Sequence, residues 1–558
     1  MELSGAELIV QLLERQGISI VAGIPGGAVL PLYQALGASK QIRHVLARHE
    51  QGAGFIAQGM ARVSGRAAVC IATSGPGVTN ILTALADAKL DSIPMVCITG
   101  QVPRHLMGTD AFQEVKTGYL AETITKANFI ARSASDLLDL IPEAFRIAEG
   151  GRPGPVLIDV PKDVQMERIT LSDWPEPGRA YAMPTLDHAL IAQAAMMIDA
   201  AKRPVLYLGG GVVKARAQAD ALALAERAAL PAAATLMALG AMPSGHPLAL
   251  GMLGMHGARF TNQVMEDADL VIAIGARFDD RATGRVDRFC PNAKIIHIDV
   301  DRREFGKIKT PTLAIEADAG EALRALWPLV KAQMRNDWLL HVAALRRRLP
   351  LRTPGLHDPR TPYGIVRAVA EIAGPDAAVT TDVGQHQMWV AQSYPFQRPD
   401  RWLTSGGLGT MGFGLPAAIG AALALPGTLT ICFSGDGSLL MNVQELATLA
   451  ELDLNIKIVV LDNAALGMVH QQQTLFYGAQ HVASKFQRPT DLCALAQAFG
   501  VPAIDLAEAG DARAALQEAF EVPGPCLIRV PVTMQHHVMP MVAAGKANTE
   551  AIESAHSA

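Results

Sequence analysis

The sequence predicts an α/β protein made of three doubly wound parallel-sheet domains. Short apolar runs such as "AAVCIAT" and "PMVCITG" alternate with helical stretches along nearly the whole chain, as in parallel strands joined by helical crossovers. The length of 558 residues is several times that of a typical domain. Hydrophobic residues make up 50% of the chain and charged residues 18%, which indicates a globular protein.

Composition divides the chain into an N-terminal, a central and a C-terminal domain. The N-terminal domain, residues 1–166, closes with "GPVLIDVPKDV", and the polar, proline-bearing stretch after it (167–188) predicts a linker. The central domain, residues 189–330, contains the strand patterns "RPVLYLGGG" and "AKIIHIDVD". A charged helical passage leads to the C-terminal domain, residues 360–540, and a tail at 541–558 follows.

Charge and composition argue against several partners and compartments. The formal net charge of -5 gives no electrostatic reason to expect nucleic acid. No apolar run reaches the roughly 18 residues of a membrane span, and the charged stretch "MELSGAELIVQLLERQG" lacks a signal-peptide core. The six cysteines are scattered without a CxxC pair, which favours a reducing compartment. We expect a cytoplasmic protein.

The stretch "ICFSGDGSLLMN" predicts a phosphate-binding turn that carries an acid. Gly435 and Gly437 let the backbone approach a ligand closely, and a helix N-terminus follows them. Asp436 can face a diphosphate if Mg²⁺ lies between, because Mg²⁺ takes one or two protein oxygens together with phosphate oxygens and water. Asn463 ends the strand pattern "NIKIVVLDN", after one helix and one returning strand, so both residues should meet at one sheet edge.

Each of these two residues alone has a simpler explanation. Asp436 could be an Asx-turn residue and Asn463 a loop cap. Taken together at this spacing, they favour the metal–diphosphate interpretation. The N-terminal domain repeats the same order of strand, Ser-Gly-x-Gly turn and helix in "AVCIATSGPGVTNILTAL", but without the acid. The chain therefore resembles a repeated domain of which one copy has a function that the other lacks.

Two further positions have a structural and a functional interpretation. Glu50 in "LARHEQGAGFIAQGMAR" stands where a strand pattern ends and a helix begins, so it could serve only as a first-turn acid. Met411 in "LTSGGLGTMGFGLPAAIGAAL" precedes another helix and could be core filler. The functional interpretation of both depends on a family resemblance.

The segment from Asp436 to Asn463 resembles the motif of thiamine-diphosphate enzymes, and the likeness covers nearly the whole chain. "ARHEQGAGFIAQGMAR", "GQVPRHLMGTDAFQE", "GRPGPVLIDVPKDV", "LGMLGMHG" and "GARFDDR" resemble the large catalytic subunits of the acetohydroxyacid synthase (acetolactate synthase) family, above all the bacterial isozyme I type. The resemblance implies three domains of the thiamine-diphosphate enzyme type. It also implies a transferase that decarboxylates pyruvate and ligates the two-carbon group to pyruvate or 2-ketobutyrate. The products, 2-acetolactate or 2-aceto-2-hydroxybutyrate, lead to the branched-chain amino acids valine and isoleucine.

The resemblance assigns roles around the thiamine diphosphate. Glu50 matches the glutamate that promotes the imino tautomer of the cofactor's aminopyrimidine, and Met411 matches the apolar wedge that keeps the cofactor bent. Ser438 and Met468 match cofactor contacts, and Ala465 matches a third metal ligand.

The resemblance also implies FAD in the central domain. A plain strand-to-helix turn would equally explain the glycine trio of "VLYLGGGVV". An acid at a strand end can accept hydrogen bonds from the adenosine part. FAD would be structural, since net carboligation transfers no electrons. The expected FAD residues are Gly209, Gly210, Gly211, Arg277, Arg281, Asp299 and, as a weaker candidate, Asp318.

Substrate-side residues follow from the same resemblance. Many relatives carry tryptophan at the position of Gln472, which narrows the pocket and favours 2-ketobutyrate, so we expect weak preference between the two ketoacids here. Several relatives have proline at the position of Lys116, a second departure. The matched positions are Gly26, Phe112, Gln113, Lys162, Val469 and Gln472.

The family implies a homodimer whose active sites lie between subunits, because Glu50 and Asp436 belong to different domains, and a small regulatory subunit. Three alternatives remain. A pyruvate oxidase would use the same cofactors and pass electrons to its flavin. A nicotinamide dehydrogenase would explain the glycine turns but not the pair of Asp436 and Asn463. A catalytically inactive homologue would not need Glu50, Met411 or that pair.

Overall fold

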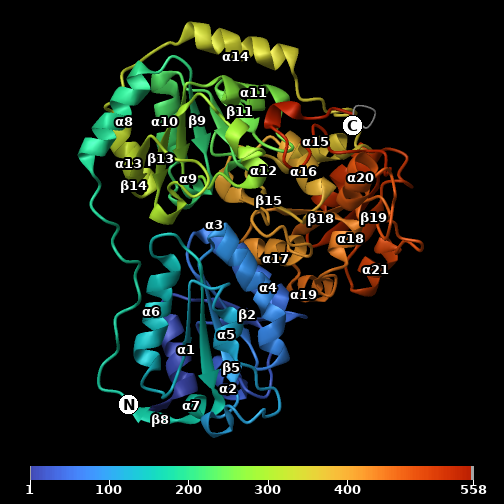
Figure 1. Cartoon of the computed structure of the whole chain (residues 1–558). Helices are drawn as coiled ribbons and strands as arrows, with labels where there is room; N and C mark the ends of the chain where they lie inside the picture. Colours follow the sequence, from blue (N-terminus) through green and yellow to red (C-terminus); the bar gives the residue numbers. More distant parts are fainter. Residues whose placement is uncertain (1, 555–558) are drawn as a thin grey trace.

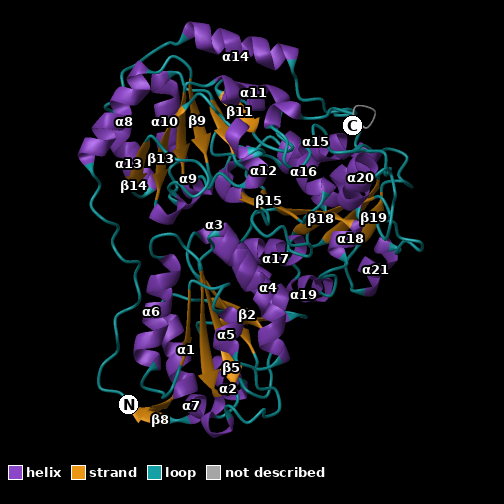
Figure 2. Ribbon diagram, viewed as in Figure 1, coloured by secondary structure: helices purple, strands orange, loops and turns teal. Residues whose placement is uncertain are grey.

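The computed structural model describes residues 2–554 and contains three six-stranded parallel sheets, each flanked by helices (Figures 1 and 2). The inner strands are mainly apolar and buried along their length, such as Ala68–Ala72 and Ile456–Asp462, because helices cover both faces of a parallel sheet. This confirms the predicted fold class. None of the helices among the described residues is long and apolar enough to cross a membrane.

The N-terminal sheet has the strand order 2-1-3-4-6-5 when its six strands are numbered along the chain. In that spatial order they are β3 (Arg43–Leu46), β2 (Ile20–Gly23), β4 (Ala68–Ala72), β5 (Met95–Gln101), β7 (Pro155–Pro161) and β6 (Ala127–Ile130). The helices are α1 (Gly5–Arg15), α2 (Leu30–Ala38), α3 (Glu50–Ser64), α4 (Pro76–Asp91), α5 (Thr117–Ala121), α6 (Leu137–Glu149) and α7 (Lys162–Met166). A separate antiparallel pair joins β1 (Glu2–Ser4) to β8 (Arg168–Thr170).

The central sheet has a different strand order, 3-2-1-4-5-6, which is the order of dinucleotide-binding folds. Its strands are β11 (Ala249–Met252), β10 (Ala232–Ala234), β9 (Pro204–Leu208), β12 (Leu270–Ile274), β13 (Lys294–Asp299) and β14 (Leu313–Glu316). Its helices are α8 (His188–Ala200), α9 (Gly210–Lys214), α10 (Gln218–Ala228), α11 (Arg259–Asp267), α12 (Asp280–Thr283), α13 (Ala319–Leu326) and α14 (Asn336–Arg348).

The C-terminal sheet repeats the N-terminal order, 2-1-3-4-6-5. Its strands are β16 (Trp402–Leu403), β15 (Ala378–Thr381), β17 (Thr430–Gly435), β18 (Ile456–Asp462), β20 (Cys526–Pro531) and β19 (Ala503–Asp505). Its helices are α15 (Pro362–Ala373), α16 (Gln385–Ser393), α17 (Gly414–Ala424), α18 (Asp436–Leu439), α19 (Glu445–Leu452), α20 (Gly467–Phe476), α21 (Leu492–Ala498) and α22 (Ala512–Glu521).

The N- and C-terminal domains meet along helices α3 and α17, drawn in blue and orange in Figure 1. Gly59 and Gly420 allow this close approach, because a Cβ on either would collide with the backbone of the facing helix. The rings of Phe55 and Phe413 pack edge to face at 5.3 Å across the same contact. The two domains therefore share a buried apolar core.

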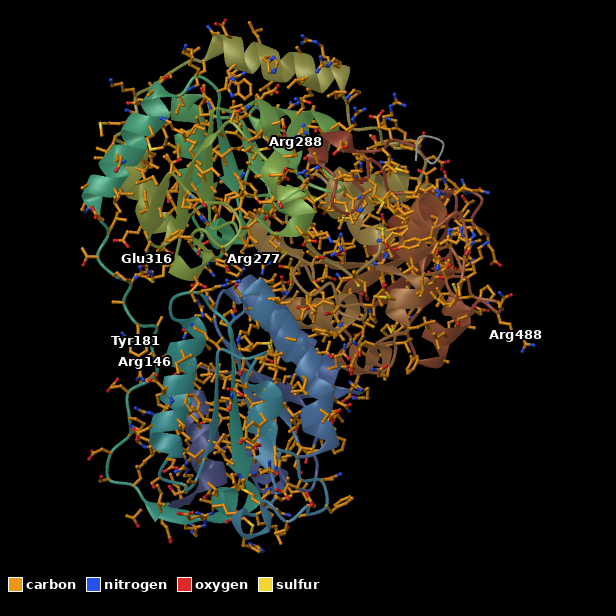
Figure 3. All side chains as sticks on the ribbon, in the orientation of Figure 1. Arg146, Tyr181, Arg277, Arg288, Glu316 and Arg488 are labelled. Carbon is orange, nitrogen blue, oxygen red and sulfur yellow. The ribbon has the colours of Figure 1, made fainter. Side chains whose placement is uncertain are left out.

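The chain from the N-terminal to the central domain runs as an extended segment beside α6 (Figure 1). Gln16 fixes this segment with two hydrogen bonds, donating to the Gly178 carbonyl at 2.6 Å and accepting from its amide at 2.8 Å. Figure 3 shows Tyr181 of the segment next to Arg146 of α6, with the guanidinium 5.6 Å from the ring centroid.

The tail packs back on the central domain. Asn548 donates to the Ala282 carbonyl at 2.7 Å, and the Arg285 amide donates to the Lys546 carbonyl at 2.9 Å. Residues 555–558 of the predicted tail lie outside the described residues.

Candidate active site

The acid-bearing turn is built at the carboxyl end of β17. The strand ends at Gly435 and α18 begins at Asp436, whose side chain is buried. The Ala465 amide lies 3.1 Å from Asp436 Oδ2 and 3.1 Å from Asn463 Oδ1, donating to both. The structure thus brings together the three predicted metal ligands. Two short helices, α18 and α19, separate Asp436 from β18, where the sequence pattern predicted one.

The electrostatics of the turn favour a cation. Burial raises the pKa of Asp436 to about 7, and the neighbouring Asp462 carboxylate contributes. Asp462 is itself paired with Arg529 at 2.7 Å. Residues 2–554 contain no group of three His, Cys, Asp or Glu side chains arranged for a metal. A carboxylate, an amide oxygen and a backbone carbonyl instead suit Mg²⁺, which fills its remaining positions with phosphate and water.

The turn glycines are required by close neighbours rather than by φ. A Cβ on Gly435 would lie 2.9 Å from His386 Nδ1, and one on Gly437 would lie 2.8 Å from Leu466 Cδ2. Ser438 Oγ donates to the Val383 carbonyl at 2.7 Å, which ties the turn to the end of β15. These close neighbours leave no room for a side chain at either glycine.

A cavity of about 60 Å³ lies above this turn, at the point where the strand order of the C-terminal sheet reverses. Such switch points are the usual ligand sites of doubly wound sheets. Met411 lines this cavity and also the larger one described next, so it stands at the border between them. The predicted residues lining the small cavity are Met411, Gly435, Asp436, Gly437, Ser438, Asn463, Ala465, Met468 and Val469.

A second cavity, of about 830 Å³, extends from Met411 into the central domain. It opens at the ends of β9 and β12, the two strands that flank the switch point of the 3-2-1-4-5-6 sheet. Its walls contain both residues predicted to border the substrate and residues predicted to bind FAD. The predicted residues among them are Gly210, Gly211, Arg277, Arg281, Asp299, Asp318, Met411, Met468, Val469 and Gln472.

The FAD-side residues differ in how they are held. A Cβ on Gly209 would collide with the Gly275 backbone, so Gly209 serves the packing of two strand ends behind the cavity. Arg277 donates to the Leu90 carbonyl at 2.9 Å and reaches toward the N-terminal domain (Figure 3). Burial raises the pKa of Asp299 to about 6. Asp318 caps α13 by accepting from the Gly320 and Glu321 amides.

Several charged wall residues escaped the sequence analysis. Arg152 pairs with Glu304 at 2.6 Å, and desolvation lowers the pKa of the half-buried Lys214 to about 8. Burial also lowers the pKa of His256 to about 4. Asp91 reaches the cavity from α4 of the N-terminal domain. The sequence signal for Lys214 was its place one helical turn after Gly210. Arg152 and His256 stand in the quoted segments "GRPGPVLIDVPKDV" and "LGMLGMHG", and Asp91 had no signal.

A second group of predicted residues gathers in the N-terminal domain, around the turn after β4. Glu50 begins α3, and its Oε2 accepts from Asn80 Nδ2 at 2.9 Å. A Cβ on Gly26 would lie 2.5 Å from Thr73 Cβ, and one on Gly75 would lie 2.8 Å from Gln113 Cβ. This is the switch point of the N-terminal sheet, between β2 and β4.

The two groups do not meet within one chain. Neither described cavity is lined by Gly26, Glu50, Phe112, Gln113 or Lys162. Phe112 is 88% exposed, an unusual position for a large aromatic side chain. Lys162 follows the end of β7 as the first residue of α7.

Family models and curated relatives match along the chain. Residues 3–120, 191–326 and 382–530 match the N-terminal TPP binding domain, the central domain and the C-terminal TPP binding domain of thiamine pyrophosphate enzymes. The acetolactate synthase isozyme 1 large subunit of Escherichia coli (strain K12) is 56% identical over 98% of this chain and 97% of its own length. Chloroplastic acetolactate synthase 1 of Nicotiana tabacum is 44% identical (98% and 84%), and the acetolactate synthase large subunit of Corynebacterium glutamicum is 45% identical (98% and 90%).

These matches confirm the predicted family resemblance. The chain belongs to the acetolactate synthase family of thiamine pyrophosphate enzymes.

Proposed function

We propose that this chain is the catalytic subunit of an acetolactate synthase. It would decarboxylate pyruvate and ligate the two-carbon group to pyruvate or 2-ketobutyrate, giving 2-acetolactate or 2-aceto-2-hydroxybutyrate for branched-chain amino acid synthesis. One observation carries the proposal: Asp436, Asn463 and Ala465 converge at a cavity that Met411 also lines, in a chain 56% identical to a named acetolactate synthase large subunit.

The acid-bearing turn would hold thiamine diphosphate through Mg²⁺. Asp436 Oδ, Asn463 Oδ1 and the Ala465 carbonyl would coordinate the ion, and the backbone at Gly435 and Gly437 would face the diphosphate. When bound, the cofactor supplies an acidic ring carbon that becomes the nucleophile toward a ketoacid. Met411, which lies between the two cavities, would support the bent cofactor from below.

Glu50 would act in the active site of a partner copy. Its carboxyl group is oriented by Asn80, so it can hold a proton at the aminopyrimidine nitrogen in a fixed direction. Because Asp436 lines the small cavity and Glu50 lines neither of the two cavities described in residues 2–554, we infer a homodimer in which each site takes Glu50, Gly26 and Gln113 from one copy. Phe112 and Lys162 of that copy would border the substrate channel.

The central domain would bind FAD as a structural group. The support is the 3-2-1-4-5-6 strand order and the cavity at its switch point, which is large enough for a dinucleotide and lined by Gly210, Gly211, Arg277, Arg281 and Asp299. Asp318 would contribute at the far wall. No step of the ligation requires electrons from a flavin.

Gln472 and Val469 would border the position of the second ketoacid. Both side chains line the large cavity, on the same helix as Met468. A small regulatory subunit is a further proposal, because the relatives in Escherichia coli and Corynebacterium glutamicum are named large subunits. The cytoplasmic location of the protein stays a prediction.

The test is a pyruvate assay of the purified protein with thiamine diphosphate, Mg²⁺ and FAD that follows acetolactate and oxygen together. Acetolactate without oxygen uptake is the expected result. Stoichiometric oxygen loss without acetolactate would instead identify a pyruvate oxidase.

A further inference from the structure

A buried cluster of charges joins the N-terminal domain to the loop that carries Met411. Arg62 of α3 pairs with Asp91 at 2.8 Å and with Asp87 at 3.3 Å, both on α4. The side chains of all three are at most 5% exposed. Two carboxylates thus share one guanidinium in a dry environment, and the second negative charge needs other donors.

Those donors come from residues 404–410 of the C-terminal domain. Asp87 Oδ2 accepts from Ser405 Oγ and from Thr410 Oγ1, the latter at 2.9 Å. Asp91 accepts from the Gly406 amide at 3.1 Å and the Gly407 amide at 2.7 Å.

The guanidinium completes the contact, because Arg62 Nη1 donates to the Thr404 carbonyl at 3.0 Å. A Cβ on Gly407 would lie 2.7 Å from Leu90 Cβ, so the loop can approach α4 this closely only with glycine. The charged cluster and the loop fit each other in both hydrogen bonding and shape.

The same loop forms a wall of the large cavity, through Ser405, Gly406, Gly407, Leu408 and Gly409. It ends at Thr410, directly before Met411. On the other side of Met411, the Gly412 amide donates to Asp382 at 2.7 Å, and Asn442 donates to the Gly412 carbonyl at 2.8 Å. Met411 is therefore held between an acid of the N-terminal domain and an acid of its own domain.

We propose that Asp87 and Asp91 are positioning residues that set the height of Met411 beneath the cofactor. The inference rests on the proposed function, and it adds a role for the N-terminal domain within its own chain. Glu50 and Arg62 lie on the same helix, α3, twelve residues apart, or about 18 Å at 1.5 Å per residue. One end of α3 would serve the partner's cofactor and the other end would position Met411 of the same chain.

A role confined to folding would not need this arrangement. Apolar residues of similar volume would stabilise the fold as well as a buried ion pair does. Here two carboxylates share one guanidinium, and the loop supplies further donors to both of them. The hydrogen bonds that the loop donates to Asp87 and Asp91 fix the conformation of the loop backbone. Displacing the loop would move Met411 while the rest of the α3–α17 contact stays intact.

The experiment compares Thr410→Val with Thr125→Val. Thr410→Val removes one donor to Asp87 and keeps the side-chain shape. Thr125→Val is the matched control, because Thr125 is a buried threonine of the N-terminal domain that donates to the Ala121 carbonyl at 2.7 Å and lines neither cavity. Turnover, KM for pyruvate, thermal midpoint and hydrogen exchange of residues 404–411 are measured for both.

For Thr410→Val we expect kcat to fall about tenfold, since a hydrogen bond to a charged group is lost, with KM for pyruvate little changed. The Gly406 and Gly407 amides should exchange faster, and the thermal midpoint should match that of Thr125→Val. Asp87→Asn should show the larger effect of the same kind, and Thr410→Ser, which keeps the hydroxyl, should recover most of the loss.

Unchanged kcat and unchanged exchange in both Thr410→Val and Asp87→Asn would overturn the proposal, as would a loss of kcat in Thr125→Val of the same size. The exchange measurement does not depend on the reaction. If the wild-type protein binds thiamine diphosphate but forms no acetolactate, the proposed function fails while exchange in 404–411 still decides the positioning role.

Discussion

The N- and C-terminal domains have the same strand order, 2-1-3-4-6-5, and differ at the turn after the third strand. In the N-terminal domain the turn is Ser-Gly-Pro-Gly at 74–77, and in the C-terminal domain it is Ser-Gly-Asp-Gly at 434–437. Gly75 has a positive φ of 60°, whereas Gly435 has an ordinary φ of -103°. One turn is thus shaped to start a long helix with Pro76, and the other presents a carboxylate.

The helices after the two turns differ as well. α4 runs unbroken from Pro76 to Asp91, while the C-terminal copy breaks into α18 and α19. The break releases Asn442, which reaches the Gly412 carbonyl beside Met411. The unbroken helix α4 carries the acids Asp87 and Asp91. The break in the C-terminal copy places Asn442, which supports the loop that these acids hold.

The sixth strands show the third difference. β7 reads "PVLIDVP" and β20 reads "CLIRVP", so that Asp159 and Arg529 occupy corresponding places. Arg529 neutralises Asp462 beside the acid-bearing turn, whereas Asp159 is held by the neutral donors Thr99 and Gln101. Two domains with the same strand order thus carry opposite charges, Asp159 and Arg529, at corresponding places of the sheet edge. The acid-bearing turn, whose charge suits a cation, occurs at the C-terminal edge.

Removing the acid of the C-terminal turn should have the largest effect. Asp436→Asn keeps the volume and removes the charge, so Mg²⁺-dependent binding of thiamine diphosphate should weaken more than about 100-fold, beyond the loss seen for outer-shell partners of metals. Titration of protein fluorescence with the cofactor at several Mg²⁺ concentrations measures this. Asp505→Asn, a change to another partner of Arg529, is the control and should leave binding in place. Equal affinities for Asp436→Asn and the control would exclude the metal role.

Removing the acid of the N-terminal site should impair turnover without impairing binding. Glu50→Gln keeps the hydrogen bond from Asn80 possible but cannot hold the proton, so kcat should fall about 100-fold or more. Cofactor affinity should stay close to that of the wild-type protein. Full activity of Glu50→Gln would contradict the proposal that Glu50 holds a proton for the cofactor.

Mixing these two variants tests whether one active site combines Glu50 of one subunit with Asp436 of the other. In a dimer of one Glu50→Gln chain and one Asp436→Asn chain, an active site built from both subunits leaves one of two sites intact. Co-expression with two affinity tags should therefore give mixed dimers with about half the wild-type activity per dimer, far above either parent, since each parent lacks one contribution everywhere. Mixed dimers as inactive as their parents would place Glu50 and Asp436 in the same chain's site.

The strand ends that carry the site could be predicted because each is a buried apolar run followed by a glycine turn, as at Gly209 and Gly435. The sequence could not show that Asp87 and Asp91 are buried. In "TALADAKLD" they read as the charged face of an amphipathic helix, and a loop more than 300 residues away buries them. The meeting of the small and the large cavity at Met411 likewise depends on contacts between distant segments. So does the break between α18 and α19.

The buried acid of the N-terminal edge should make stability depend on pH. Burial raises the pKa of Asp159 from 3.8 to about 6, so the folded state binds this proton more tightly than the unfolded state. The free energy of unfolding contributed by Asp159 is then fully present below pH 4 and is lost as pH rises from 4 to 6, by about 2 to 3 kcal/mol. Asp159→Asn should remove this loss. Urea unfolding of both proteins at pH 4, 5, 6 and 7 measures it, and parallel curves would contradict it.

The smallest effect concerns the substrate side of the C-terminal copy. Gln472 lines the large cavity one helical turn after Met468, where a larger ring would reduce the space beside the reacting centre. Because 2-ketobutyrate differs from pyruvate by one methylene, a closer apolar wall should raise the 2-aceto-2-hydroxybutyrate share about tenfold in Gln472→Trp. Competition between the two ketoacids, with both products quantified, measures the ratio.

Gln472→Leu separates the two properties of the new side chain, since it removes the amide without adding a ring. It should leave the product ratio close to that of the wild-type protein. If Gln472→Leu shifts the ratio as far as Gln472→Trp does, the polarity of the wall decides and not its reach. If neither shifts it, the choice of second ketoacid is made elsewhere, and the exposed Phe112 of the N-terminal copy becomes the residue to change, because across a dimer interface it would face the same cavity from the other side.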